Sequence, residues 1–375
     1  MKEQRKVFSY FYFLIFFAWG AYYPLISQYY KRIGLSGQQI GIILASGTIV
    51  ALISQPIWGF LSDHKNLHRK NLNIMIIGLM VVTAIMPLSK DFVFIFITVV
   101  LLNIFQSGTT PVVDSIVTSG GHDYGKIRLW GSAGFAIAAL CAGVLTDMIN
   151  IYVIFAFYSV SCIGVLISIR YMKIPKIEKI GKTEFDFTWI FKNKGFLLVI
   201  ICAFFLYGTL NTQNTYFGLL YEELGGNMSG LGMIMLLFAM SEVPLMQMVG
   251  KLIRKFGAWN LIIAACIITA GRWFWYGHVN TWQPVMAMFF IHGIVIALFI
   301  PSAIHLIVEN SPADKKAIGM TLYYSLGSGL GTAVCQFISG NIYDAGGVKN
   351  VYMFMGIFAV VAFGTAIIGR WQKKT

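Results

Sequence analysis

The stretch KIPKIEKIGKTEFDFTWIFKNK, residues 173–194, is the longest polar interruption in a chain of 375 residues that otherwise consists of long apolar runs. Six apolar runs precede this stretch and six follow it. Each run is long enough to cross a hydrocarbon core of about 30 Å as a helix that rises about 1.5 Å per residue. The predicted spans are residues 7–30, 36–61, 71–89, 91–118, 125–147, 150–172, 195–221, 228–250, 258–277, 279–308, 316–342 and 347–370.

The composition supports this interpretation of the apolar runs. Hydrophobic residues make up 57% of the chain and charged residues 11%. The mean hydropathy is +0.73, far above that of a soluble domain. We therefore predict an all-α integral membrane protein with twelve transmembrane helices. Residues 1–172 and 195–375 are expected to form two six-helix bundles, joined by residues 173–194 as a cytoplasmic linker.

The basic residues indicate the topology. The formal net charge is +13, and the 28 Lys and Arg residues cluster in alternate connecting segments. If the N-terminus is cytoplasmic, all but five of these residues fall in cytoplasmic segments; the exceptions are Lys31, Arg32, Lys90, Lys349 and Arg272. The positive-inside rule then places both termini in the cytoplasm. Because topology accounts for the positive charge, nucleic-acid binding is not supported.

The two halves of the chain resemble each other. Gly59 in the second span corresponds to Gly250 in the eighth, at an offset of 191 residues, and Pro111 corresponds to Pro301 at an offset of 190. The segment GVLTD, residues 143–147, corresponds to GNIYD, residues 340–344, at an offset of 197. A duplicated six-helix unit with a substrate site near the membrane midplane is a secondary-transporter architecture.

Cysteine and histidine give no sign of metal or redox chemistry. The five cysteines stand singly in apolar spans, and the six histidines form no pair at metal-ligand spacing. We expect no metal and no cofactor. No convergent nucleophile and base are present either, so enzymatic activity is not expected.

Ionisable residues inside the predicted spans are the strongest functional signal, because a charge at the centre of a bilayer costs about 3 kcal/mol or more. The candidates are Asp114, Glu242, Arg272, His292 and Glu309. Glu242 and Arg272 form either a structural ion pair between helices or part of a proton-coupling site. His292 either bonds a backbone carbonyl or titrates beside these two groups.

Polar side chains also form stripes at helical spacing. A stripe in either half fits helix packing, but stripes in both halves favour the lining of a shared cavity. The stripes are Asn103, Gln106, Thr110 and Asp114 in the fourth span, Tyr207, Asn211 and Asn214 in the seventh, and Thr321, Ser325, Ser328, Thr332 and Gln336 in the eleventh. His305 and Glu309, four residues apart near the end of the tenth span, are predicted to form an interfacial or gating pair.

The segment GFLSDHKNLHRK, residues 59–70, resembles the signature between the second and third helices of the major facilitator superfamily. Gly59, Asp63, Arg69 and Lys70 carry the match. The resemblance implies a cytoplasmic gate in which the aspartate caps a neighbouring helix and the basic residues form ion pairs. The later glycine of that signature is absent here.

Within that superfamily, DYGKIRLWGSAGF, residues 123–135, resembles the fifth-helix motif of the lactose permease and phenylpropionate permease branch, which adjoins the nucleoside permeases. The resemblance implies that Asp114 and Arg128 bind substrate. Lys126 lies at the cytoplasmic edge of the span and is predicted to be an anchor. The alternative for Arg128, two residues further in, is that its long side chain snorkels outward. The resemblance also places Phe135 where lactose permeases carry a tryptophan that stacks on the sugar. Asn211 joins these residues as a substrate-binding prediction from the polar stripe of the seventh span.

In the C-terminal half, SEVP, GRW and FIHG resemble polar positions of the same permeases, which implies proton coupling through Glu242, Arg272 and His292, with His292 also contacting substrate. The carboxylate that lactose permeases carry in the tenth helix aligns with Val295. Coupling therefore has to use Glu242, His292 or Asp114.

These observations predict a monomeric bacterial plasma-membrane permease that imports a small polar organic solute, such as a sugar, nucleoside or aromatic acid, with protons by alternating access. The alternative on the same fold is a proton-antiport exporter of drugs or metabolites. A facilitator without proton coupling and a receptor that binds without transport also remain open.

Overall fold

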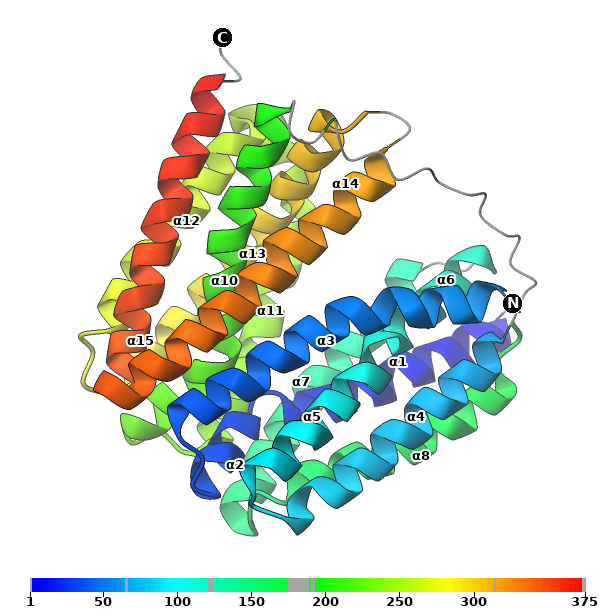
Figure 1. Ribbon diagram of the computed structural model, residues 1–375. Coiled ribbons are helices and arrows are strands. Elements are labelled where there is room, and N and C mark those ends of the chain that lie inside the picture. Colours follow the sequence, from blue (N-terminus) through cyan, green and yellow to red (C-terminus); the bar gives the residue numbers. More distant parts are fainter. Residues whose placement is uncertain are drawn as a thin grey trace. The chain divides into compact units, whose positions relative to one another are not determined.

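The computed structural model describes residues 2–64, 67–120, 124–174, 189, 193–312 and 315–372. For residues 2, 63, 64, 236, 238–247 and 317 only the backbone is described. Every regular element in these ranges is a helix (Figure 1). In the first half these are α1 (Lys2–Tyr22), α2 (Ile26–Arg32), α3 (Gly37–His64), α4 (His68–Ile85), η1 (Met86–Leu88), α5 (Phe92–Ser107), α6 (Thr109–Ser119), α7 (Tyr124–Met148) and α8 (Val153–Tyr171).

The second half is also helical. It contains α10 (Lys194–Glu223), α11 (Met228–Phe256), α12 (Ala258–Tyr276), α13 (Trp282–Asn310), α14 (Lys316–Leu322), the π-helix η2 (Tyr323–Leu330) and α15 (Gly331–Gln372). Among the described residues, ten helical runs are long and apolar enough to cross a membrane. The protein is therefore a multi-pass membrane protein.

The last of these runs, Ile318–Gln372, has 55 residues. It is interrupted at Gly347, whose φ of 75° and ψ of −179° are not helical. Glycine populates such positive φ values without the steric penalty of a Cβ atom. Figure 1 shows the chain reversing its direction near this point, so α15 consists of two helical arms.

The chain forms two compact units. Unit 1 comprises residues 1–35, 46–182 and 227–236, and unit 2 comprises residues 36–45, 183–226 and 237–375. The first turns of α3 therefore pack within unit 2, and the first turns of α11 pack within unit 1.

The repeated segments GVLTD (residues 143–147) and GNIYD (residues 340–344) share the pattern G-x-x-x-D. They account for both of these placements. In unit 2 the Asp344 carboxylate accepts hydrogen bonds from the amides of Gly37 (2.6 Å) and Gln38 (2.7 Å) at the start of α3. A carboxylate is favourable there because it satisfies unpaired N–H groups and opposes the positive end of the helix dipole. A Cβ atom at Gly340 would lie only 2.6 Å from the Gly37 carbonyl oxygen, so glycine is needed for this close approach.

The first copy of the motif does the same in unit 1. Asp147 accepts hydrogen bonds from the amides of Met228 (3.2 Å) and Ser229 (2.7 Å) and from the Ser229 hydroxyl (2.5 Å) at the start of α11. A Cβ atom at Gly143 would lie 2.3 Å from the Met228 carbonyl oxygen. The correspondence seen in the sequence thus reflects one packing device used twice.

Close packing also brings α1 against α7, and this contact positions the candidate site of unit 1. A Cβ atom at Gly20 would lie 2.2 Å from the Phe135 carbonyl oxygen, and one at Gly134 would lie 2.2 Å from the Phe13 carbonyl oxygen. Small residues let helix backbones approach where van der Waals contact is the main attraction.

Candidate functional site

Asp114 of α6 lies against α1 in unit 1. The hydroxyl of Tyr12 donates a hydrogen bond to Asp114 Oδ1. Tyr12 is fully buried, and its ring stacks on that of Phe16 with centroids 6.4 Å apart. The carboxylate is thus held by a phenol that lies 102 residues away in sequence.

Arg128 of α7 lies beside the same group. Its guanidinium carbon is 3.9 Å from the centroid of the Phe16 ring, a cation–π contact. Arg128 and Tyr124, one turn earlier in α7, both act electrostatically on Asp114. Asp114 and Arg128 form no direct ion pair in the part of the chain that the structure describes. A half-buried acceptor and a half-buried guanidinium donor therefore lie near each other around aromatic rings.

Phe135 is half-buried in α7, two turns beyond Arg128. Seven residues return a helix to nearly the same face, so the two side chains share a side of α7. The aromatic ring that contacts the Arg128 guanidinium is nevertheless that of Phe16, and the Phe16 ring in turn contacts Trp19, with ring centroids 4.6 Å apart. Phe16 and Tyr12 were not predicted from the sequence.

A spacing signal existed for these missed residues. Tyr12, Phe16 and Trp19 of α1, together with Tyr23 directly after its end, recur every three or four residues and form an aromatic stripe. Two hydrogen bonds join this stripe to the predicted polar stripe of α5 and α6. Gln106 Nε2 donates to the Tyr23 hydroxyl, and the Tyr12 hydroxyl donates to Asp114. Aromatic and polar stripes on facing helices together build the candidate site in unit 1.

A second polar cluster lies in unit 2, at Arg272 of α12. Arg272 Nη2 donates to Gln213 Oε1 of α10 (2.9 Å) and lies 2.8 Å from His292 Nδ1 of α13. All three side chains are buried. The guanidinium also lies 4.2 Å from the ring centroid of Trp273.

The hydrogen bond between Arg272 and His292 fixes the state of the imidazole. A guanidinium has only N–H donors, so His292 Nδ1 must accept and cannot carry a proton in this arrangement. His292 is therefore the neutral tautomer with its hydrogen on Nε2. Protonation of Nδ1 requires the contact with Arg272 to break first.

Glu242 lies on α11, but its side chain is outside the described residues. Its predicted association with Arg272 stays a prediction. Nε and Nη1 of Arg272 have no hydrogen-bond partner among the residues that the structure describes. These atoms retain capacity for a further acceptor.

Asn211 lies in α10, as Gln213 does, but its side chain contacts different residues. Its Nδ2 donates to Thr332 Oγ1 (2.8 Å) and lies 3.4 Å from Ser328 Oγ. Ser328 is part of the π-helix η2, and such wide turns frequently accompany functional sites. The polar stripes predicted for the seventh and eleventh spans are therefore joined by hydrogen bonds.

The residues of the predicted gate motif lie around the end of α3 and the start of α4. Arg69 donates to the carbonyl oxygen of Met172, and Lys70 is exposed. A Cβ atom at Gly59 would meet no atom within 4 Å, so this glycine is not required by a close contact. The side chain of Asp63 is outside the described residues.

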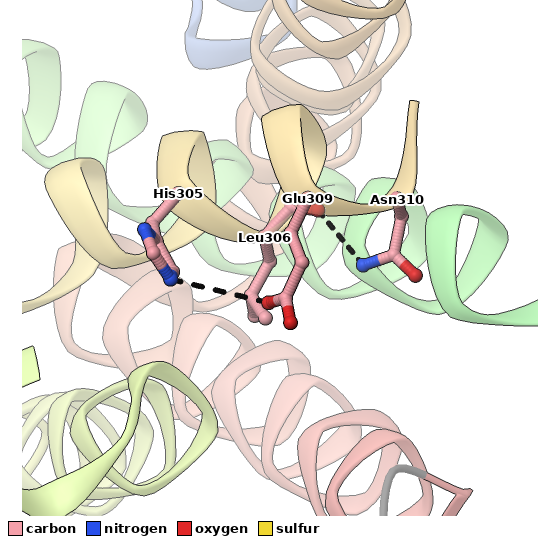
Figure 2. A network of polar contacts seen from close by, with 4 residues as sticks. All are labelled: His305, Leu306, Glu309 and Asn310. Atoms are coloured by element: carbon pink, nitrogen blue, oxygen red, sulfur yellow. Dashed lines mark hydrogen bonds and ion pairs between the residues drawn. The ribbon is translucent and has the colours of Figure 1, made fainter. Parts of the chain in front are cut away.

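His305 and Glu309 of α13 lie on one helix face, as their spacing predicts, with His305 Nε2 and Glu309 Oε2 3.9 Å apart (Figure 2). Both side chains are about half exposed, so the pair contributes little to stability. The neighbouring Asn310 donates from Nδ2 to the Leu306 carbonyl oxygen (2.8 Å) and accepts at its own carbonyl from Asn193 Nδ2 (2.7 Å). Among the described residues, no three His, Cys, Asp or Glu side chains gather as metal ligands.

Comparison with known proteins gives consistent matches along the chain. The sequence profile of the MFS_1 like family matches residues 6–354. The maltose permease of Geobacillus stearothermophilus is 33% identical over 381 residues, which cover 99% of this chain and 96% of the permease. The probable 3-phenylpropionic acid transporter of Escherichia coli is 22% identical, covering 94% of this chain and 92% of that protein.

Among solved structures, the nucleoside transporter NupG superposes with a TM-score of 0.83 at 15% identity, over 98% of each chain. At this level of identity the likeness concerns the fold alone.

Proposed function

The chain belongs to the MFS_1 like family of transporters, and we propose that it imports a sugar together with protons by alternating access. Its family and relatives are transporters and not enzymes. The observation that carries the sugar assignment is the cluster around Asp114 and Arg128. The relative named maltose permease supports the same substrate class.

The chemistry of the unit 1 cluster suits a sugar. Sugar hydroxyls both donate and accept, so a carboxylate and a guanidinium bind neighbouring hydroxyls of one ring. The apolar face of a sugar ring packs on an aromatic side chain, and half-buried Phe135, on the same face of α7 as Arg128, is assigned this role. Phe16 is buried beneath the Arg128 guanidinium and orients it. Tyr12 holds the carboxylate in position.

Proton coupling is assigned to the unit 2 cluster of Arg272, His292 and Glu242. Neutral His292 accepts from Arg272, so release of the guanidinium frees Nδ1 for a proton. A substrate or a conformational change that draws Arg272 away would thereby couple transport to protonation. Asn211 is assigned to the substrate-binding surface of α10.

The architecture proposed for this activity has twelve transmembrane helices. The 29-residue length of α11 and the break at Gly347 support that number, beside the ten described apolar runs. The positive-inside distribution supports cytoplasmic termini. We further assign the protein to a bacterial cytoplasmic membrane, as a monomer, with Gly59, Asp63, Arg69 and Lys70 as its cytoplasmic gate motif.

Uptake into proteoliposomes tests this function. The purified full-length chain is reconstituted and offered radiolabelled maltose, other oligosaccharides, nucleosides and aromatic acids, with and without an inward proton gradient. We expect sugar uptake that the gradient stimulates and that Asp114→Asn and Arg128→Ala abolish. Lys126→Ala, two residues from Arg128, is the matched control and should transport normally.

Each alternative has its own outcome. Uptake that ignores the pH gradient rejects symport and leaves a facilitator. Transport of nucleosides or aromatic acids without sugars rejects the substrate class. Accumulation only in everted vesicles identifies an exporter, and binding without flux identifies a receptor.

A further inference from the structure

A cavity of about 540 Å³ lies at the beginning of α1 in unit 1, within the size range of about 300–1,000 Å³ that is typical of ligand sites. It is lined by Arg5, Lys6, Ser9, Tyr10 and Phe13 of α1 and by Trp130 of α7. The transport function proposed above does not use any of these residues.

The lining changes from charged to apolar along α1. Arg5 and Lys6 stand near the start of the candidate membrane span Glu3–Arg32. Phe13 lies eight residues beyond Arg5, or about 12 Å further along the helix. Cations at the end of a span, followed by an aromatic wall within it, match the order of headgroup and acyl chain in a phospholipid.

The two cations are available to a ligand. The preceding residue, Gln4, is turned toward α8, where its Nε2 donates to the Tyr171 carbonyl oxygen (3.1 Å) and its Oε1 accepts from the Lys173 amide (2.7 Å). This contact fixes the start of α1, while Arg5 and Lys6 are exposed and form no ion pair with another residue that the structure describes. Glu3, the nearest carboxylate in sequence, does not line the cavity.

The aromatic walls of the cavity are exposed. Tyr10 is 66% exposed and Trp130 is 52% exposed. Tyr and Trp are enriched at the level of lipid headgroups because each ring is apolar but carries one hydrogen-bonding group. Their position beside two cations distinguishes the cavity from a site for a small soluble anion, which would gain nothing from an aromatic wall.

The cavity is distinct from the substrate cluster. Lys6 and Tyr10 line it, whereas Tyr12 holds Asp114. On a helix of 3.6 residues per turn, Tyr10 and Tyr12 point in directions about 160° apart. A molecule held by Tyr10 and Trp130 therefore lies on another side of α1 from the substrate.

We propose that this cavity binds an anionic phospholipid, with its phosphodiester between Arg5 and Lys6, its glycerol region along Ser9 and Tyr10, and one acyl chain against Phe13 and Trp130. The charge of the site selects the headgroup. A basic residue near an anionic lipid surface contributes about 1 kcal/mol, or about fivefold in affinity, so two cations give a preference on the order of tenfold or more.

Native mass spectrometry of the full-length protein released from nanodiscs tests the proposal. The nanodiscs contain equal amounts of phosphatidylglycerol and phosphatidylcholine with identical acyl chains. We expect the wild type to retain phosphatidylglycerol at least tenfold more than phosphatidylcholine. Arg5→Gln combined with Lys6→Gln should abolish that preference. Lys251→Gln combined with Lys255→Gln removes the same charge at the end of α11 and should preserve it.

Two further measurements separate the parts of the site. Trp130→Ala should shorten the retention of both lipids without changing their ratio. In detergent, phosphatidylglycerol should raise the melting temperature and inorganic phosphate should not. If the double variant cannot be purified folded, Lys6→Gln alone should lower the preference about fivefold.

Three results overturn the proposal. These are equal retention of the two lipids by the wild type, an unchanged preference in the variants that lack Lys6, and equal protection by inorganic phosphate, which would identify a simple anion site.

Discussion

The Tyr12→Phe substitution tests whether the hydroxyl on α1 positions the Asp114 carboxylate of the proposed substrate site. The change removes one oxygen, and with it the hydrogen bond to Asp114. Phenylalanine retains the ring that stacks on Phe16 and meets the edge of Tyr124, so the fold should persist.

The size of the expected loss in sugar affinity follows from the charge of Asp114, which accepts the hydrogen bond. A hydrogen bond to a charged group contributes about 1.5–3 kcal/mol, and about 1.4 kcal/mol corresponds to a factor of ten. Because Tyr12 is fully buried, no water directly replaces its hydroxyl in the same place. We expect the substrate dissociation constant to rise about tenfold to a hundredfold.

The assay is isothermal titration of the purified protein with the sugar that gives the highest uptake. Tyr10→Phe is the matched control, because Tyr10 lies two residues earlier in α1 and is 66% exposed. Loss of its hydroxyl should leave sugar affinity unchanged. Wild-type affinity in Tyr12→Phe, together with loss of binding in Asp114→Asn, would refute the positioning role.

Three other predictions follow from the fold and the buried cluster. Asp344→Asn should lower the free energy of unfolding by about 1 kcal/mol and speed hydrogen exchange at the Gly37 amide, because the charge that opposes the dipole of α3 is lost. An unchanged exchange rate at Gly37 would contradict the capping role of Asp344. Gly347→Ala should lower the melting temperature, because a φ of 75° with a ψ of −179° is a region that is essentially restricted to glycine and costs another residue about 1–3 kcal/mol. Gly364→Ala, where a Cβ meets no atom within 4 Å, should not lower it, and equal effects of the two substitutions in thermal denaturation would argue against backbone strain. Arg272→Lys should reduce proton-driven uptake at least tenfold, because an ammonium group cannot reproduce the contacts of the planar guanidinium with Gln213 and His292. Full uptake by this variant in proteoliposomes would exclude the unit 2 cluster from proton coupling.

Much of the fold was predictable because its signals are local. Apolar length and the distribution of basic residues are properties of each segment alone, and they predict membrane helices without knowledge of the packing. Residues 143–147 and 340–344 were recognised as a repeat from five letters each. Their function as helix caps was not, because the capped amides belong to helices that start far away in sequence.

The candidate site was predictable only in part. Asp114 stood out because a charge is expensive in a membrane. Arg128 was predicted from the resemblance of residues 123–135 to the fifth-helix motif of the lactose permease branch. Tyr12, Phe16 and Gln213 did not stand out, since a tyrosine, a phenylalanine and a glutamine are ordinary residues in an apolar helix. Their importance depends entirely on which charged group they contact.

The sequence by itself determined that this protein is a helical membrane transporter, where most of its helices run and which charges need a partner. Only the tertiary structure decided the partners: Tyr12 for Asp114, Phe16 for Arg128, and Gln213 with His292 for Arg272. The physical reason is range. Hydropathy and helical spacing are set by residues within a few turns, whereas a buried hydrogen bond joins side chains that only the packing of distant helices brings together.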